Sequence, residues 1–286
     1  MLTMPGQAMR TKDHALRVVK HGFLISASVV FLFPFMWMVL GIFKTNTEIW
    51  QQPYKLLPDS VNLGAVLSSL PQTDLGTYIL NSLTVGIAGT VLMLAAATLF
   101  TYVVVFMRSR YSDLLFALVL GTYMLPGAVT YVPSYVILAN LGLLDTLTGL
   151  VFSNMASVFA VFYLRQSFKK VSYDYIDAAR IDGANHIRTI WHVVLPLNKS
   201  ALMTLATLTF IELYNDYLWP NIMLNSQEKY LVSQGLRQFF IQQGAYGMNW
   251  ADVMLASTVT ILPLVVLFVI GQNWLVTGIM QDSGLK

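Results

Sequence analysis

Six stretches of mostly apolar residues divide the chain, and they limit its fold more than any other feature of the sequence. A helix needs roughly 20 mostly apolar residues to cross the hydrocarbon core of a bilayer. Charged residues make up only 11% of the chain, against about a quarter in soluble proteins, so we expect most of the surface to face lipid. Strand-like alternation is absent, so the sequence predicts an all-α membrane protein with six transmembrane helices. The apolar stretches cover residues 23–43, 78–106, 114–138, 147–164, 201–224 and 253–274.

The positions of lysine and arginine predict the orientation, because cytoplasmic loops are enriched in both residues. If the N-terminus lies inside, 13 of the 17 fall on the cytoplasmic side: Arg10, Lys12, Arg17, Lys20, Arg108, Arg110, Arg165, Lys169, Lys170, Arg180, Arg188, Lys199 and Lys286. The other four fall outside: Lys44, Lys55, Lys229 and Arg237. We therefore expect two cytoplasmic termini, with a basic tail at 1–22, a six-helix domain at 23–275 and a C-terminal tail at 276–286. The net charge of +3 then follows from topology and indicates no nucleic-acid partner.

No arrangement of residues in the sequence indicates an enzyme. The chain contains no cysteine, so disulfides and thiolate ligands are excluded. It has no glycine-rich phosphate loop followed by lysine and serine or threonine, so we do not expect it to bind ATP. Its four histidines lack the spacing of a zinc site. We therefore expect no catalytic residue, no metal site and no cofactor bound by this chain.

A polar loop at residues 169–199 interrupts the apolar pattern between the fourth and fifth stretches. From Tyr173 to Ala184 it carries acidic and basic side chains together, with small residues between them. Gly183 permits a sharp backbone turn, and Pro196 marks where a second short helix stops or changes direction. An amphipathic helix lying on the inner leaflet is one explanation. An anionic leaflet would not select the acidic side chains, so the mixed charges favour a groove in a partner protein.

The spacing within this loop resembles the EAA loop of binding-protein-dependent ABC importers. The family pattern is Glu-Ala-Ala, three residues, Gly, nine residues, Ile, one residue and Leu-Pro. Every spacing is matched here, with Asp177 in place of Glu and Val193 in place of Ile: Asp177-Ala178-Ala179, Gly183, Val193 and Leu195-Pro196. Three further segments resemble the carbohydrate (maltose-type) branch of the family: Asn81-Ser82-Leu83, Leu141-Gly142-Leu143-Leu144-Asp145-Thr146 and Asn215-Asp216-Tyr217-Leu218-Trp219-Pro220.

The resemblance implies the type I ABC importer permease fold in the cell inner (plasma) membrane. The expected partners are a second, related permease that completes a heterodimer, two ATPase subunits that hold ATP and Mg, and an extracytoplasmic solute-binding protein. The loop at 169–199 would dock on one ATPase subunit and couple hydrolysis to movement of the spans. The docking residues that follow from the match are Tyr173, Ile176, Asp177, Ala178, Ala179, Arg180, Asp182, Gly183, Ala184, Leu195 and Pro196.

A polar cluster in the fifth stretch is the candidate substrate path. Glu212, Asn215 and Asp216 share one face of a helix, and ionisable groups within a span usually face a cavity or a partner. In this interpretation they contact sugar hydroxyls, and Tyr214 or Trp219 offers a stacking face. The alternative is that the cluster pairs across the heterodimer interface or caps a proline kink.

The external loop at 225–250 resembles the segment that such permeases present to the binding protein. Amide and aromatic side chains suit the recognition of a docked partner, although an ordinary solvated loop is the alternative. The candidate contacts are Gln242, Gln243, Tyr246 and Asn249.

The sequence thus predicts half of the translocation pathway of an ATP-driven importer for a sugar or oligosaccharide. Two alternatives stay open: a permease for a phosphorylated polyol or other small polar solute, and an ion-coupled secondary carrier. Transport of an anion would favour lysine or arginine inside the spans, and the sequence has them only at the edges. A secondary carrier would show inverted repeats and buried ion sites, and the sequence shows neither.

Overall fold

The computed structural model describes residues 5–61, 74–107, 109–242 and 249–282 of the 286-residue chain. Its regular elements within these ranges are all helices, as the sequence predicts. The chain divides into two compact units: Met1–Gln72 with Gln243–Val259, and Thr73–Gln242 with Thr260–Lys286. The domain boundaries expected near residues 22 and 275 stay predictions.

The first unit contains α1 (Pro5–Gly41), α2 (Asn46–Gln51) and the beginning of α16 (Trp250–Asp282). A capping box starts α2, because the Thr45 side chain accepts from the backbone N–H of Glu48 while the Glu48 carboxylate accepts from the backbone N–H of Thr45. Asn46 Oδ1 accepts from the Trp250 backbone N–H at 2.8 Å, and the two rings of Trp50 and Trp250 meet edge to face. These contacts hold α2 against the start of α16.

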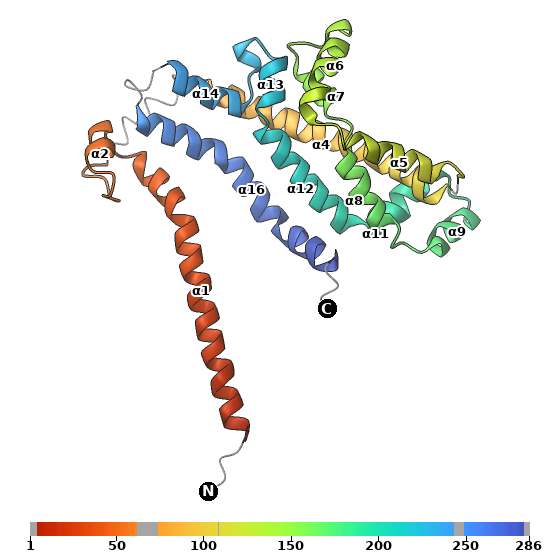
Figure 1. The fold of residues 1–286 in the computed structure, drawn as a ribbon, viewed down its shortest axis with the longest axis horizontal. Coiled ribbons are helices and arrows are strands. Elements are labelled where there is room, and N and C mark those ends of the chain that lie inside the picture. The colour runs from red at the N-terminus through yellow and green to blue at the C-terminus, as the bar shows by residue number, and fades with distance from the viewer. Residues whose placement is uncertain (1–4, 62–73, 108, 243–248, 283–286) are drawn as a thin grey trace. The chain divides into compact units, whose positions relative to one another are not determined.

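In the second unit, α4 (Leu75–Phe106) is the central helix, and the neighbouring helices pack along its length (Figure 1). The helices that contact it are α5 (Ser112–Thr122), α7 (Leu147–Ser153), α8 (Val158–Phe168), α12 (Lys199–Asn215) and α14 (Val232–Gln242). Glycine allows the close packing of α4 on α12, because a Cβ atom at Gly86 would lie only 2.9 Å from the Phe210 ring.

The second unit has two apolar cores along α4. One apolar core surrounds the C-terminal half of α4 and includes Phe106, Phe168 and Ile176. A second core lies toward the other end and includes Val85, Leu150 and Leu231. The remaining elements are α6 (Gly127–Asn140), α9 (Tyr173–Ile181), α10 (His186–Thr189), η2 (Ile190–Val194), α11 (Leu195–Leu197), α13 (Leu218–Met223) and η3 (Gln227–Lys229).

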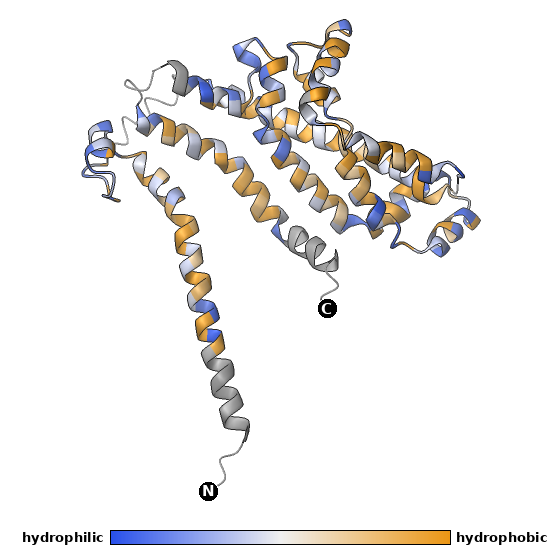
Figure 2. Ribbon diagram, viewed as in Figure 1, coloured by the Kyte–Doolittle hydropathy of each residue, from blue (hydrophilic) through white to orange (hydrophobic). Residues whose placement is uncertain are grey.

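Three described helices are long and apolar enough to cross a membrane: Leu16–Gly41, Leu75–Phe106 and Trp250–Gln272. The number rises to five if each of two bent helix pairs counts as one span, so the predicted six are not confirmed. Figure 2 shows apolar residues along α1, α4 and α16.

The predicted third, fourth and fifth spans each contain a break. Residues 123–126 separate α5 from α6, and Pro126 cannot donate the backbone hydrogen bond of a continuing helix. The helices α7 and α8 meet at 49°, and Ser157 caps α8 by accepting from the Ala160 N–H. Residues 216–217 separate α12 from α13.

Candidate functional site

The loop at 169–199 folds into four short helical segments, α9, α10, the π-helix η2 and α11. Side-chain caps start two of them. Ser172 Oγ accepts from the Asp174 N–H at 3.2 Å at the start of α9, and Asn185 Oδ1 accepts from the Arg188 N–H at 2.8 Å at the start of α10. Serine and asparagine are preferred at this position because they satisfy free backbone donors.

Gly183 ends α9 in the left-handed region, with φ of +78°. The Ala184 N–H donates to the Ala179 carbonyl at 2.9 Å, and the Gly183 N–H donates to the Arg180 carbonyl at 3.0 Å. This pair of bonds is the Schellman arrangement, in which glycine carries no Cβ penalty. A Cβ atom at Gly183 would meet nothing within 4 Å, so within this chain the backbone conformation is what requires glycine. The predicted turn is confirmed.

The loop is attached firmly to the C-terminal end of α4. The Tyr102 hydroxyl of α4 lies 3.0 Å from His186 Nδ1 of α10, and Tyr102 is buried. The Tyr173 hydroxyl donates to the Val105 carbonyl. Ile176 is fully buried in the core around the same end of α4. The prediction of Ile176 as a docking contact is therefore wrong: it anchors α9 to its own chain and leaves no surface for a partner.

The outward face of the loop carries large apolar side chains. Ile181 is 86% exposed, Ile187 65% and Trp191 66%. The Asp177 carboxylate pairs with the Arg180 guanidinium at 3.6 Å across one helical turn, and both side chains are partly exposed. Ile187 and Trp191 are not among the predicted docking residues, although their spacing of four residues places them on one helical face in an otherwise polar segment.

The polar residues predicted to line the substrate path lie near the end of α12. Glu212 and Asn215 are exposed near the end of α12, where Asn215 Nδ2 donates to the Ile211 carbonyl at 3.0 Å. Asp216 is half-buried where α12 ends. Glu212 and Asn215 lie in the last turn of α12, but Asp216 follows the helix end in an extended conformation (φ −60°, ψ 135°). The prediction that all three share one helical face is therefore wrong for Asp216, because the helix ends before it.

Tyr214 and Trp219 do not offer a stacking face, so their predicted role is corrected. Tyr214 is fully buried, and its hydroxyl donates to the Thr260 carbonyl at 2.9 Å. Trp219 is also buried; its Nε1 donates to Ser153 Oγ at 2.8 Å, and its ring stacks on Tyr131. Both rings hold helices of this chain together.

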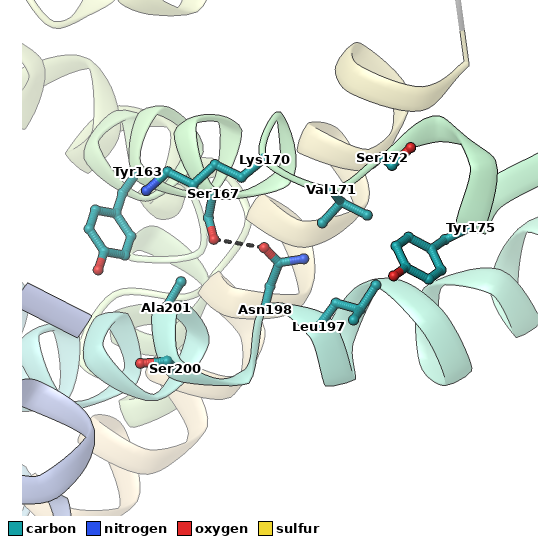
Figure 3. Close-up of a pocket in the computed structure, with 10 residues that line it drawn as sticks. All are labelled: Tyr163, Ser167, Lys170, Val171, Ser172, Tyr175, Leu197, Asn198, Ser200 and Ala201. Atoms are coloured by element: carbon teal, nitrogen blue, oxygen red, sulfur yellow. Dashed lines mark hydrogen bonds between the residues drawn. The ribbon is translucent and has the colours of Figure 1, made fainter. Parts of the chain in front are cut away.

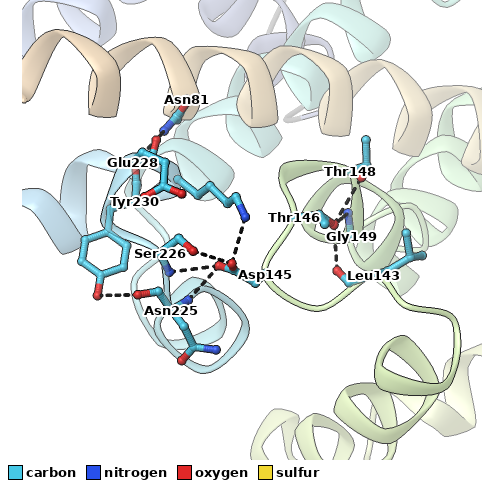
Figure 4. A network of polar contacts seen from close by, with 11 residues as sticks. Asn81, Leu143, Asp145, Thr146, Thr148, Gly149, Asn225, Ser226, Glu228 and Tyr230 are labelled. Atoms are coloured by element: carbon cyan, nitrogen blue, oxygen red, sulfur yellow. Dashed lines mark hydrogen bonds and ion pairs between the residues drawn. The ribbon is translucent and has the colours of Figure 1, made fainter.

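A polar network that sequence analysis did not assign joins the turn before α7 to the segment after α13 (Figure 4). The Asp145 carboxylate accepts from the backbone N–H groups of Asn225 and Ser226 at 3.0 Å, from Ser226 Oγ at 2.6 Å and from Lys229 Nζ at 2.8 Å. The Lys229 contact, followed by those of Ser226 and Asn225, holds the pKa of Asp145 well below its usual range. We call these four residues the Asp145 clamp.

The segment that follows the Asp145 clamp is fixed against the opposite end of α4. Asn81 Nδ2 donates to the carbonyls of Glu228 and Tyr230 at 2.9 and 3.1 Å, and the Val232 N–H donates to Ser82 Oγ at 2.9 Å. The Asn-Ser pair that resembles the family thus positions η3 and α14. Within the expected external loop, η3 and α14 are therefore helical, and hydrogen bonds from α4 hold them in place.

Of the predicted contacts for the binding protein, Gln243 and Tyr246 lie outside the described residues, as does the side chain of Gln242. Asn249 is half-buried just before α16. Among the described residues, no group of three His, Cys, Asp or Glu side chains is placed to hold a metal ion.

Comparison with known proteins gives one family match, to residues 93–281, for the family described as "Binding-protein-dependent transport system inner membrane component". The chain is 34% identical over 275 residues to the sn-glycerol-3-phosphate transport system permease protein UgpE of Yersinia pestis bv. Antiqua (strain Antiqua), covering 94% of this chain and 97% of the relative. It is 26% identical over 279 residues to the diacetylchitobiose uptake system permease protein NgcG of Streptomyces coelicolor, covering 97% and 92%.

The fold is similar to a chain in the crystal structure of a bacterial ABC transporter involved in the import of the acidic polysaccharide alginate. The TM-score is 0.80 at 22% sequence identity, over 92% of this chain and 97% of the other. At 22% identity this similarity is evidence for the fold alone.

Proposed function

Since this chain belongs to the family of binding-protein-dependent transport system inner membrane components, we propose that it forms half of the translocation pathway of its importer. The family predicted from the loop spacing is confirmed. The chain is a multi-pass inner-membrane permease and a transport component rather than an enzyme, and ATP is hydrolysed by a separate subunit. In the proposed complex the other half of the pathway comes from a second, related permease. We also propose that the chain has six membrane spans and that both of its termini lie in the cytoplasm.

The observation that supports coupling is the firm attachment of an exposed loop to α4. We propose that residues 169–199, here called the docking loop, dock on one of two ATPase subunits, which hold ATP and Mg. Ile181, Ile187 and Trp191 present exposed apolar surface, while Tyr102 and Tyr173 contacts bind the loop to α4. When the ATPase subunits close, force on the docking loop moves α4 and its neighbours as a rigid body.

The solute is proposed to be a sugar or oligosaccharide delivered by an extracytoplasmic solute-binding protein. Glu212, Asn215 and Asp216 supply oxygen and amide groups that suit hydroxyl-rich solutes. A phosphorylated polyol is the second candidate, because the relative UgpE is named for sn-glycerol-3-phosphate transport. An ion-coupled carrier has no such support.

The deciding experiment is uptake into proteoliposomes that contain this chain, its partner permease, the ATPase subunits and the binding protein. We expect uptake to require ATP inside the vesicles and to survive collapse of the membrane potential. Labelled chito-oligosaccharide and labelled sn-glycerol-3-phosphate distinguish the two solute classes. Uptake without ATP, or loss of uptake with the membrane potential, would contradict the importer assignment.

The substrate-path proposal predicts the behaviour of Asn215→Leu. Loss of one hydrogen bond to the solute should reduce uptake by about three- to tenfold, while assembly and basal ATP hydrolysis persist. Asn154→Leu is the matched control, because Asn154 makes the same kind of bond to a carbonyl four residues earlier, at 2.9 Å, outside the cluster. If Asn215→Leu instead prevents assembly, the cluster joins helices and the path assignment is wrong.

We propose that the tip of the external loop contacts the binding protein, and a single cysteine tests this in an otherwise cysteine-free chain. Tyr246→Cys is expected to form a cross-linked adduct with the binding protein. Tyr175→Cys, on the docking loop, serves as the control and should give an adduct with the ATPase only. Failure of Tyr246→Cys to form the expected adduct in every nucleotide state would exclude the contact.

A further inference from the structure

A cavity of about 410 Å³ lies at the base of the docking loop (Figure 3). One wall is the end of α8 and the residues after it, including Tyr163 and Lys170. The other wall is the corner between α11 and α12, including Asn198 and Ser200. In Figure 3 the Lys170 side chain extends over the cavity from the α8 side, opposite Ser200. The function proposed above assigns no role to this cavity.

The lining of the cavity mixes polar and apolar side chains, and one of its polar residues is buried. Asn198 is only 4% exposed; its Oδ1 accepts from Ser167 Oγ at 2.7 Å, and its Nδ2 donates to the Val194 carbonyl at 2.8 Å. These bonds fix the 85° bend between the helices on either side of Asn198. The buried Ser200 hydroxyl has no hydrogen-bond partner within the described part of the chain. Buried hydroxyls usually have a hydrogen-bond partner, so we expect the Ser200 hydroxyl to bond to a group that occupies the cavity.

The charge of the cavity favours an anion. Lys170 is the charged residue among those that line it. No aspartate or glutamate is among the described lining residues. The cavity also adjoins the beginning of α12, whose N-cap residue Asn198 gives no side-chain cap, and a helix N-terminus carries partial positive charge.

The position of the cavity favours a lipid as the source of that anion. It lies where α8 and α12, each part of a bent pair apolar enough to span a membrane, give way to a polar loop. Along α8, Phe159 is 46% exposed and Phe162 42%. The Phe159 ring stacks on Tyr163, which lines the cavity. An acyl chain can therefore pack on exposed aromatic surface while its headgroup reaches the cavity. Basic pockets between helices at the cytoplasmic side are typical headgroup sites.

We propose that this cavity binds the phosphate headgroup of an anionic phospholipid of the inner leaflet. The lipid would brace the end of α8 against the corner between α11 and α12, and so fix the angle at which the docking loop leaves the membrane. The assignment to the inner leaflet rests on the proposed orientation of the docking loop. Binding of the lipid itself is measured without transport, so its failure and that of the proposed function are distinguishable.

The test uses the whole complex in nanodiscs with a photoreactive phosphatidylglycerol, and mass spectrometry locates the adducts. In the wild-type complex we expect adducts at the residues that line the cavity. Lys170→Gln should lower labelling there by about fivefold, the effect of one partly exposed ion pair. Lys169→Gln removes the same charge one residue away, outside the lining, and should leave labelling within about twofold.

Ala201→Phe is a second variant that fills the cavity without changing charge, and it should also suppress labelling. Equal losses in both lysine variants, or no loss in Lys170→Gln and Ala201→Phe, would overturn the proposal. So would displacement of the lipid by millimolar inorganic phosphate, which would indicate a site for a free anion. Labelling that appears only after the ATPase subunits are removed would indicate a protein contact there and would equally overturn it.

Discussion

Replacement of Gly183 by valine is expected to lower solute-stimulated ATP hydrolysis and uptake by about tenfold or more. An L-residue in the left-handed region costs roughly 1–2 kcal/mol, and a β-branched residue tolerates it least. With φ of +78° at Gly183, the turn after α9 will rearrange and displace Ile187 and Trp191, which we propose face the ATPase. The measurements are co-purification of the ATPase subunits, stimulated hydrolysis and uptake.

Two further variants separate the causes of this loss. Gly121→Val is the control, since Gly121 also has no atom within 4 Å of a built Cβ but lacks a positive φ; it should behave as wild type. Gly183→Asp keeps the turn at lower cost, because aspartate visits this region more readily, but places a charged side chain on the docking surface. We expect it to uncouple uptake from hydrolysis as well. Wild-type activity in Gly183→Val would refute the role of the turn.

The second large effect is expected at the Asp145 clamp. In Asp145→Asn the backbone conformation is retained, since asparagine also tolerates the φ of +53°. The charge that pairs with Lys229 is lost, and an amide has one acceptor oxygen where the carboxylate has two. The side chain of Asp145 is 27% exposed and that of Lys229 35%, so water weakens these bonds. We therefore expect the free energy of unfolding to fall by about 2 kcal/mol. The apparent Tm of the complex should fall by about 4–8 °C.

The pH dependence of this difference identifies its cause. The pKa of Asp145 is lowered in the folded chain, so its contribution is fully present above the pKa of an unfolded aspartate, about 3.9. It is lost as the pH falls through the lower, folded value. The gap in Tm between wild type and Asp145→Asn should therefore be constant from about pH 7 to pH 5 and shrink below about pH 4.

Glu228→Gln is the matched control for Asp145→Asn. It removes the same charge in the same segment, where only the backbone carbonyl of Glu228 contacts Asn81 and the side chain is exposed. Its Tm should stay close to that of wild type at every pH. A Tm for Asp145→Asn within 1 °C of wild type would show that solvent satisfies the clamp residues equally well.

The sequence predicted the turn at Gly183 because the signal for a helix end is local. Gly183 and the residues on either side of it specify a helix end within one turn. The caps at Ser172 and Asn185, which the structure adds, are equally local. Local hydrogen bonds need no knowledge of the rest of the fold. The exposure of Ile187 and Trp191, by contrast, came only from the structure.

The substrate-path residues were harder to predict for a physical reason. A span is apolar on all sides, whether a side chain faces lipid or the interior, so periodicity does not show which face packs inward. Tyr214 and Trp219 are therefore no different in sequence from rings that face a pathway. The structure buries both rings and gives each a hydrogen-bond partner from another helix.

The amino-acid sequence by itself determined the membrane class, the permease family and the turn at Gly183, because apolar length, motif spacing and glycine geometry are properties of short segments. Only the tertiary structure decided that Ile176 is an anchor and that Asp145 binds a segment about 80 residues further along the chain. Contacts between residues so far apart depend on how the helices pack around α4, and no local pattern records that packing.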